Sequence, residues 1–152
     1  MSGKTFVDTN ILIYAHDRDA GLKQQIARER LRSLWEERRG VLSTQVLQEF
    51  YVNATCKIRT PLSRTDARAV VDVYAPWCAD GLTPADLSAA FRIEDEARIG
   101  FWDALIVAVA RRSGAERVLS EDLNAGQAIA GLMIENPFAE PQTPRAVRRT
   151  PS

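Results

Sequence analysis

The sequence predicts an α/β fold, a three-layer α/β/α sandwich around a central sheet of short parallel strands. Short strand-like runs such as Thr5–Val7 and Arg117–Leu119 alternate with segments of helical periodicity. This alternation predicts a parallel sheet covered on both faces, because each crossover must return over the sheet. Ala104–Ala110 is apolar on every side, as expected of a helix buried between a sheet and another helix. Asp8 and Asp122 fall just past expected strands, at the edge where open parallel sheets bind ligands.

The length and composition indicate a single globular domain. The chain has 152 residues, of which 45% are hydrophobic and 26% are charged, and such a chain buries enough surface to fold without disulfides or structural metals. We assign residues 1–138 to this domain. Residues 139–152 contain several prolines and arginines, and we expect them to form a flexible tail.

The charge balance limits the possible partners. Twenty basic and twenty acidic residues cancel, so the chain lacks the basic excess of proteins that hold nucleic acid by charge alone. A nucleic-acid role must therefore rest on a local site. The amino terminus has no signal-peptide core, and the longest apolar run is far shorter than the roughly 20 residues that span a bilayer. We expect a cytoplasmic protein without a membrane partner.

The first half of the chain reads as strand, helix, helix, strand, helix. Each helix shows apolar residues at helical spacing or a capping residue at its start. The expected elements are a strand at Thr5–Val7, a helix from Ile11, an amphipathic helix at Leu22–Arg39, a strand at Val41–Leu42 and a helix at about Gln45–Lys57 with Ser43 or Thr44 as its N-cap.

The second half continues the alternation. Ser63 and Asp66 resemble a capping box, and Thr83-Pro84 followed by Asp86 is a second helix start. Between these two helices, Trp77–Ala79 is a candidate third strand. After the apolar helix, Gly114 is suited to the left-handed conformation that ends helices. The last strand is expected at Leu132–Ile134.

Four carboxylates lie where this fold would bring them together. Asp8 and Asp122 follow strands, Asp103 begins the apolar helix, and Glu49 lies one turn into another helix. Like charges brought together raise one another's pKa values, so such a group is costly unless a cation neutralises it. Oxygen ligands favour hard divalent ions such as Mg²⁺ or Mn²⁺.

Each acid taken alone also has a simpler explanation. Asp103 and Asp8 are well placed to cap helices, Asp122 to begin a turn, and Glu49 to lie on a solvated helix face. Their shared placement favours a site, because independent caps have no reason to fall at one edge of a sheet. Glu121, beside Asp122, is expected to face away.

Four segments in chain order are similar to a known family. They are FVDTNILIYA at the start, STQVLQEFY with Glu49, WDALIVAVA with Asp103, and LSEDLNAGQ with Ser120 and Asp122. Over about residues 5–138 the chain resembles a PIN domain, the metal-dependent ribonuclease family that includes the VapC-like toxins of bacterial toxin–antitoxin pairs.

The resemblance implies roles for individual residues. Asp8, Glu49, Asp103 and Asp122 would be the metal-binding acids, with Asn10 and Ser120 as supporting polar groups. It also implies Mg²⁺ or Mn²⁺ as cofactor, RNA as substrate, a homodimer and a small antitoxin protein as partner.

The residues themselves favour hydrolysis by an activated water. Bound divalent ions can turn water into a nucleophile and stabilise both oxygens of a phosphodiester displacement, leaving 5′-phosphate and 3′-hydroxyl ends. Attack by the ribose 2′-hydroxyl commonly uses a pair of histidines, whereas this chain has only His16, which is expected to have a packing or surface role.

Two other functions remain open from the sequence. The Phe6–Asn10 segment also resembles the nucleophile strand of haloacid-dehalogenase-like phosphotransferases, although Asn10 stands where those enzymes have a second aspartate. Alternatively, the chain keeps the fold without catalysis and only binds RNA or a protein, in which case the four acids would be dispensable for binding.

Overall fold

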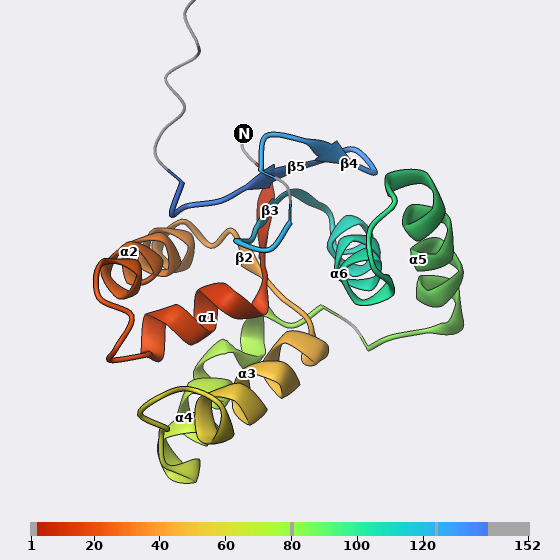
Figure 1. The fold of residues 1–152 in the computed structure, drawn as a ribbon. Coiled ribbons are helices and arrows are strands. Elements are labelled where there is room, and N and C mark those ends of the chain that lie inside the picture. The colour runs from red at the N-terminus through yellow and green to blue at the C-terminus, as the bar shows by residue number, and fades with distance from the viewer. Residues whose placement is uncertain (1–2, 80, 124, 140–152) are drawn as a thin grey trace, which may run out of the picture.

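The computed structural model describes residues 3–79, 81–123 and 125–139 (Figure 1). Its five-stranded sheet has the order β2-β1-β3-β5-β4. The strands are β1 (Lys4–Val7), β2 (Gly40–Val41), β3 (Ala115–Leu119), β4 (Ala128–Ile129) and β5 (Leu132–Glu135). The helices are α1 (Thr9–His16), α2 (Leu22–Glu37), α3 (Thr44–Cys56), α4 (Arg64–Tyr74), α5 (Pro84–Ala97) and α6 (Phe101–Arg112), with a 3-10 turn η1 at Ala75–Trp77.

The register of the central strands brings their carboxyl ends level. Val7 of β1 pairs with Leu119 of β3, and Leu119 pairs with Glu135 of β5, all in parallel. The backbone continues this pairing one residue further, because the amide of Asp8 donates to the carbonyl of Leu119 over 3.0 Å. The residues that follow β1 and β3 therefore start side by side.

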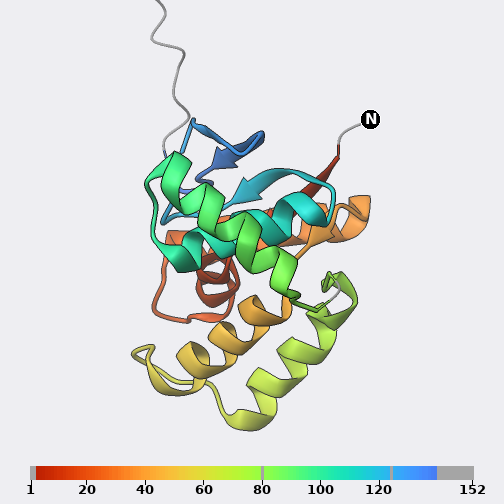
Figure 2. The same cartoon turned by 90° about the vertical axis from the view of Figure 1, so that its right-hand side faces the viewer.

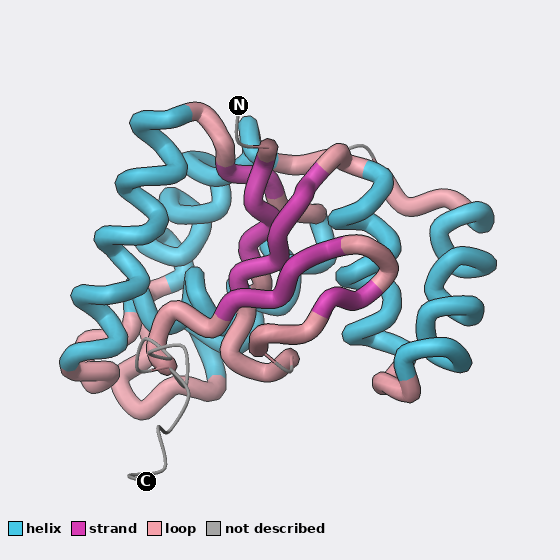
Figure 3. Tube along the Cα trace, turned by 90° about the horizontal axis from the view of Figure 1, so that it is seen from above, coloured by secondary structure: helices cyan, strands magenta, loops and turns pink. Residues whose placement is uncertain are grey.

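The helices cover both faces of the sheet, which confirms the three-layer sandwich. Figure 3 shows the strands running between two groups of helices. The α1 and α2 helices pack together on one side, and α3 and α4 pair below them (Figure 1). On the other side α5 packs against α6, and it crosses in front of α6 in Figure 2.

The apolar helix predicted from the sequence is α6. Every residue from Ala104 to Ala110 is buried, because the sheet covers one side of this helix and α5 covers another. Arg111 and Arg112 follow at its carboxyl end, and Gly114 adopts the left-handed conformation with φ 82°. Burial of this seven-residue run fixes α6, and with it the first-turn residue Asp103, in relation to the strands.

Several predicted helix starts are confirmed. The side chain of Ser43 accepts from the amide of Val46, and that of Ser63 accepts from Asp66. Thr83 and Asp86 form a capping box at α5. The α2 helix ends at Glu37, slightly earlier than expected, because Arg38 takes the left-handed conformation with φ 56°.

Two sequence expectations about the strands were wrong. Trp77–Ala79 is not a strand; Ala75–Trp77 is a 3-10 turn containing Pro76, and only Cys78 bridges to Leu42. The sheet is also not wholly parallel, since the short β4 runs antiparallel to β5 at the edge.

Two further expectations concern the membrane and the tail. Within the described ranges, no helix combines the length and apolar composition needed to cross a bilayer. The tail expected at residues 139–152 lies, apart from Ala139, outside the described residues.

Candidate metal centre

Asp8 lies at the centre of the candidate site, directly after β1. Its residue is 6% exposed, and its two carboxylate oxygens each accept one hydrogen bond, from the amide of Thr9 and from the hydroxyl of Ser120, both over 2.7 Å. Burial is the main reason that the pKa of Asp8 rises to about 6, and the charges of Asp122 and Asp103 raise it further against the lowering effect of the two hydrogen bonds. The carboxylate is therefore fixed in orientation and short of a positive partner.

Ser120 organises the turn that follows β3. Its residue is fully buried, and while its hydroxyl donates to Asp8, its oxygen accepts from the amides of Asp122 over 3.2 Å and Leu123 over 3.4 Å. The same side chain thus positions Asp8 and the backbone that carries Asp122.

Asn10 joins α1 to this turn through both ends of its amide. Its Nδ2 donates to Oδ2 of Asp122 over 3.0 Å, and its Oδ1 accepts from the amide of Glu121 over 3.2 Å. Asp122 is exposed at the surface, so this contact to Asn10 holds its carboxylate in place while leaving it open to solvent.

Glu49 reaches the site from α3 and is held by two residues that sequence reasoning missed. Its Oε2 accepts from the hydroxyl of Thr9 over 2.8 Å, and its Oε1 accepts from Nε2 of Gln45 over 3.0 Å. A signal existed for Gln45, since residues four apart on a helix are neighbours. No sequence pattern indicated a role for Thr9, because the neighbouring Asp8 already explained why the turn after the strand is polar.

Asp103 faces the other three acids from the first turn of α6. Burial raises the pKa of its carboxyl, and the charges of Asp122 and Glu49 add to that rise. Asp8 is in turn affected by Asp122 and Asp103. These mutual effects link acids from the ends of β1 and β3 and from α3 and α6, so the fold brings the four predicted residues into one electrostatic neighbourhood.

The four acids fit a divalent cation by their chemistry. In the part of the chain that the structure describes, none of them forms an ion pair with a lysine or arginine, whereas Asp86, Glu121 and Glu135 each do. A buried or crowded carboxylate without a counter-charge is unfavourable, and four oxygen donors suit a hard ion. Within the same ranges, no three His, Cys, Asp or Glu side chains are placed closely enough to hold a metal ion.

Glu121 points to a different set of partners, as the sequence led us to expect. Its carboxylate accepts from the hydroxyl of Tyr14 and pairs with the ammonium of Lys23. The Lys23 ammonium also lies 4.8 Å from the ring centre of Tyr14. These contacts hold the turn after β3 against α1 and α2, one residue before Asp122.

His16 lies at the far end of α1 and packs among aromatic rings. Its ring centre is 5.7 Å from that of Phe50 and 6.4 Å from that of Tyr74. Burial, and then the charge of Arg28, lower its pKa, and among the described residues its Nε2 has no hydrogen-bond partner. This ring therefore has a packing role, one of the two roles expected of it.

The sequence matches a known protein family over most of its length. Residues 5–128 match the model of the PIN domain. The chain therefore belongs to the PIN domain family.

Solved structures of the same fold include two toxin-related proteins. A chain of the VapBC2 structure from Rickettsia felis, solved bound to a DNA fragment from its promoter, is 16% identical with a TM-score of 0.59, and the match covers 87% of this chain and 97% of that one. VapC20 from Mycobacterium tuberculosis, described as a toxin that cleaves the sarcin–ricin loop, is 19% identical with a TM-score of 0.55, and the match covers 78% and 90%. At these identities the likeness concerns the fold. No curated protein sequence matches the chain.

Proposed function

We propose that the protein is a metal-dependent endoribonuclease that hydrolyses RNA to 5′-phosphate and 3′-hydroxyl ends, and that it is the toxin of a toxin–antitoxin pair. The observation that carries this proposal is the set of four acids without basic partners at the carboxyl end of a PIN-domain sheet. The fold shared with VapC20 supports the choice of RNA.

Asp8, Glu49, Asp103 and Asp122 would hold Mg²⁺ or Mn²⁺. When bound, such an ion supplies an activated water and stabilises the developing charge on the phosphodiester oxygens. The chain's own part is to hold these carboxylates in the correct orientation.

Asn10, Thr9 and Ser120 provide that orientation. Ser120 fixes one oxygen of Asp8, Asn10 fixes one oxygen of Asp122, and Thr9 fixes one oxygen of Glu49. In each contact the neutral side chain donates to the carboxylate and leaves the second oxygen to other partners. Pre-set donors of this kind lower the cost of arranging charged groups during the reaction.

The site offers no histidine pair for attack by the ribose 2′-hydroxyl. His16 is the single histidine of the chain, and it packs against Phe50 and Tyr74 rather than beside the acids. Hydrolysis by water, with a 5′-phosphate product, is therefore the route that the residues support.

The proposal is tested with end-labelled RNA incubated with Mn²⁺ or with EDTA, followed by analysis of the product ends. Cleavage in Mn²⁺ with 5′-phosphate ends, absent in EDTA and in Asp103→Asn, is the expected result. Asp95→Asn removes an exposed acid from α5 and serves as the matched control. Cleavage that persists in EDTA, or products with cyclic phosphates, would contradict the mechanism.

We further infer that an antitoxin protein binds this chain in the cytoplasm. The fold shared with a chain of VapBC2 supports this partner. Induced expression should then arrest growth of the host cell, while Asp103→Asn should be harmless. Growth that continues with active, soluble wild-type protein would oppose a toxin role while leaving nuclease activity possible in vitro.

A homodimer is also part of the proposal. Phe91 on α5 and Trp102 on α6 are 52% and 67% exposed, and the ring of Phe101 lies between them at 5.8 Å and 5.3 Å. Large apolar groups exposed together favour an interface. Light scattering should give twice the chain mass, and Phe91→Glu should give a monomer.

A further inference from the structure

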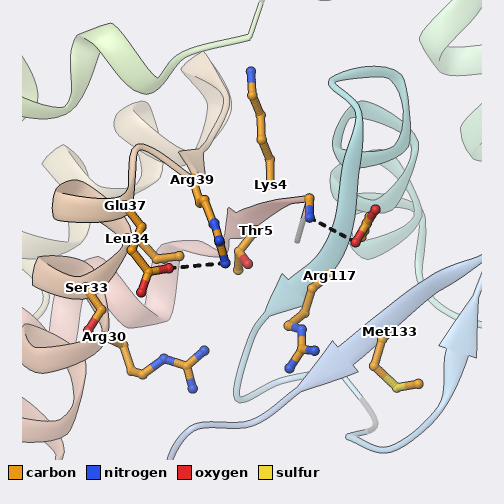
Figure 4. Close-up of a pocket in the computed structure, with 11 residues that line it drawn as sticks. Lys4, Thr5, Arg30, Ser33, Leu34, Glu37, Arg39, Arg117 and Met133 are labelled. Atoms are coloured by element: carbon orange, nitrogen blue, oxygen red, sulfur yellow. Dashed lines mark hydrogen bonds and ion pairs between the residues drawn. The ribbon is translucent and has the colours of Figure 1, made fainter. Parts of the chain in front are cut away.

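The amino-terminal end of the sheet carries a second surface that the proposed site does not use. Two neighbouring cavities open there, of about 520 Å³ between α2 and the strands β3 and β5, and of about 390 Å³ beside two tryptophans. Figure 4 shows the first, with Arg30 and Arg117 reaching into it from opposite sides. Lys4 lines both cavities. We call the surface formed by Lys4, Arg30, Trp35, Arg38, Trp77 and Arg117 the distal basic surface.

This surface holds an excess of positive charge in a chain whose net charge is zero. Arg117 and Arg30 both pair with the same carboxylate, that of Glu135. In the part of the chain that the structure describes, Lys4 and Arg38 have no acidic partner within ion-pair distance. The excess remains after Glu116 is counted, whose carboxylate accepts from the amide of Gly3 at the rim of the first cavity.

An aromatic platform adjoins these cations. The rings of Trp35 and Trp77 are 5.4 Å apart with a 33° tilt, and Tyr74 lies edge-on against both. Trp35 is nevertheless 45% exposed. The backbone of Gly40 lies directly against Trp77, since a Cβ there would come within 2.5 Å of that ring. Trp77 and Tyr74 thus support Trp35 from beneath and leave part of its indole open beside Lys4 and Arg38.

We propose that the distal basic surface binds a single-stranded segment of RNA. Proteins that hold single strands combine cations along the phosphate backbone with aromatic rings on which bases stack, and both are present here. Charge alone would suit an acidic peptide equally well, but a supported, half-exposed tryptophan between cations favours nucleobases. Lys4 begins β1 and Asp8 follows its other end, so the cations and rings that lie beside Lys4 would contribute RNA affinity without touching the reacting phosphate.

The charge component is tested by binding of a fluorescein-labelled 20-residue oligouridine in EDTA, measured by anisotropy at several salt concentrations. The variant Lys4→Glu/Arg38→Glu should bind at least about tenfold more weakly than wild type, and its salt slope should fall by about 1.4, since each phosphate contact of a single strand contributes about 0.7. The control Arg18→Glu/Arg92→Glu alters exposed arginines elsewhere and changes net charge equally. Equal affinity of the two variants would overturn the proposal.

The stacking component is tested with Trp35→Leu, which keeps an apolar side chain over Trp77. Loss of one stacked base predicts about tenfold weaker binding, together with loss of most of the tryptophan fluorescence quenching that oligouridine produces in the wild type. Trp35→Phe should restore part of the affinity. Unchanged affinity in Trp35→Leu, or equal binding of an RNA duplex of the same length, would show that stacking does not occur and refute the proposal.

This inference rests on the proposed function only for the choice of RNA, and the two can fail separately. RNA binding at this surface in EDTA, without any cleavage in Mn²⁺, would refute the nuclease proposal and support RNA binding at the distal basic surface. Cleavage that is lost in Asp103→Asn, combined with wild-type binding by Lys4→Glu/Arg38→Glu, would support the nuclease proposal and refute RNA binding at the distal basic surface.

Discussion

The hydroxyl of Ser120 donates to Oδ2 of Asp8 over 2.7 Å, in a position where Ser120 is fully buried. The two residues follow adjacent strands whose last residues, Val7 and Leu119, pair with each other. Sheet register therefore sets the distance between the donor and the carboxylate, and the site is built into the pairing of β1 with β3.

Ser120→Ala should lower both stability and activity. It leaves one oxygen of Asp8 and the amides of Asp122 and Leu123 without their partner, and losing one partner of a buried hydrogen bond costs about 1–3 kcal/mol. Chemical denaturation measures the change in the free energy of unfolding. Ser88→Ala, which removes an exposed hydroxyl on α5, is the control, and equal stability of the two variants would contradict the buried role of Ser120.

The contribution of Asp8 to the stability of the metal-free protein should fall as pH rises from about 4 to about 6. Asp8 has a folded-state pKa of about 6 against an ordinary value of 3.8, so in this window the folded state holds a proton that the unfolded state has released. This contribution of Asp8 to the free energy of unfolding is fully present below pH 3.8 and is lost as pH rises through the folded-state pKa of about 6. It amounts to about 3 kcal/mol at 1.36 kcal/mol per pKa unit.

The comparison of wild type with Asp8→Asn in EDTA isolates this effect, because the other titrating groups are common to both proteins. Urea denaturation at steps between pH 4 and pH 7 gives the two curves. Wild type should lose stability relative to the variant across the window, and parallel curves would mean that the pKa of Asp8 is not raised in the folded protein.

Mn²⁺ should raise the melting temperature of wild type and have little effect on Asp103→Asn. An ion that binds only the folded state adds about 1.4 kcal/mol at tenfold excess over its dissociation constant, which corresponds to several degrees for a domain of this size. Asp95→Asn should keep the full shift. If Asp103→Asn shifts as far as wild type, then Asp103 only begins α6 and does not bind the ion.

His16→Ala should leave the cleavage rate within a few-fold and lower stability. The ring fills space between Phe50 and Tyr74, whereas its buried Nε2 has no partner among the described residues. Single-turnover cleavage and thermal melting measure the two effects. A rate loss of about 10²-fold or more, the size associated with a general acid or base, would restore a histidine mechanism.

Much of this fold could be predicted from the sequence, because the local sequence patterns and the burial of the side chains favour the same elements. The strand before Asp8, the capping residues Ser43 and Ser63, and the all-apolar run of α6 each have one physical explanation. The hairpin of β4 and β5 was missed because its turn uses Ala130 and Gly131 with φ of 50° and 83°. Alanine seldom takes a positive φ, so the usual turn signal of Asn or Asp before Gly was absent.

The candidate site could be predicted from the sequence only in part. The placement of its four acids past strand ends and at helix starts follows from the order of elements, but the contact that orients Glu49 depends on packing between α1 and α3. The hydrogen bond from Thr9 to Glu49 joins residues 40 positions apart, and no local pattern encodes it. The distal basic surface was equally hidden, since Lys4, Arg38 and Trp77 converge only after the sheet has formed.

The burial of Ala104–Ala110 in α6 has a further consequence for how the protein loses activity. Amide hydrogen exchange is slowest in such enclosed elements and fastest in exposed segments that open locally. Asp103 lies in the first turn of α6, directly before the enclosed run, while Asp122 is exposed on the turn before the exposed residues 125–128. Opening of this turn alone would separate the two carboxylates while the rest of the domain stays folded. Activity should therefore be lost at a lower urea concentration than helical circular dichroism. Mn²⁺ should bring these two urea midpoints closer together, because it slows opening of the turn.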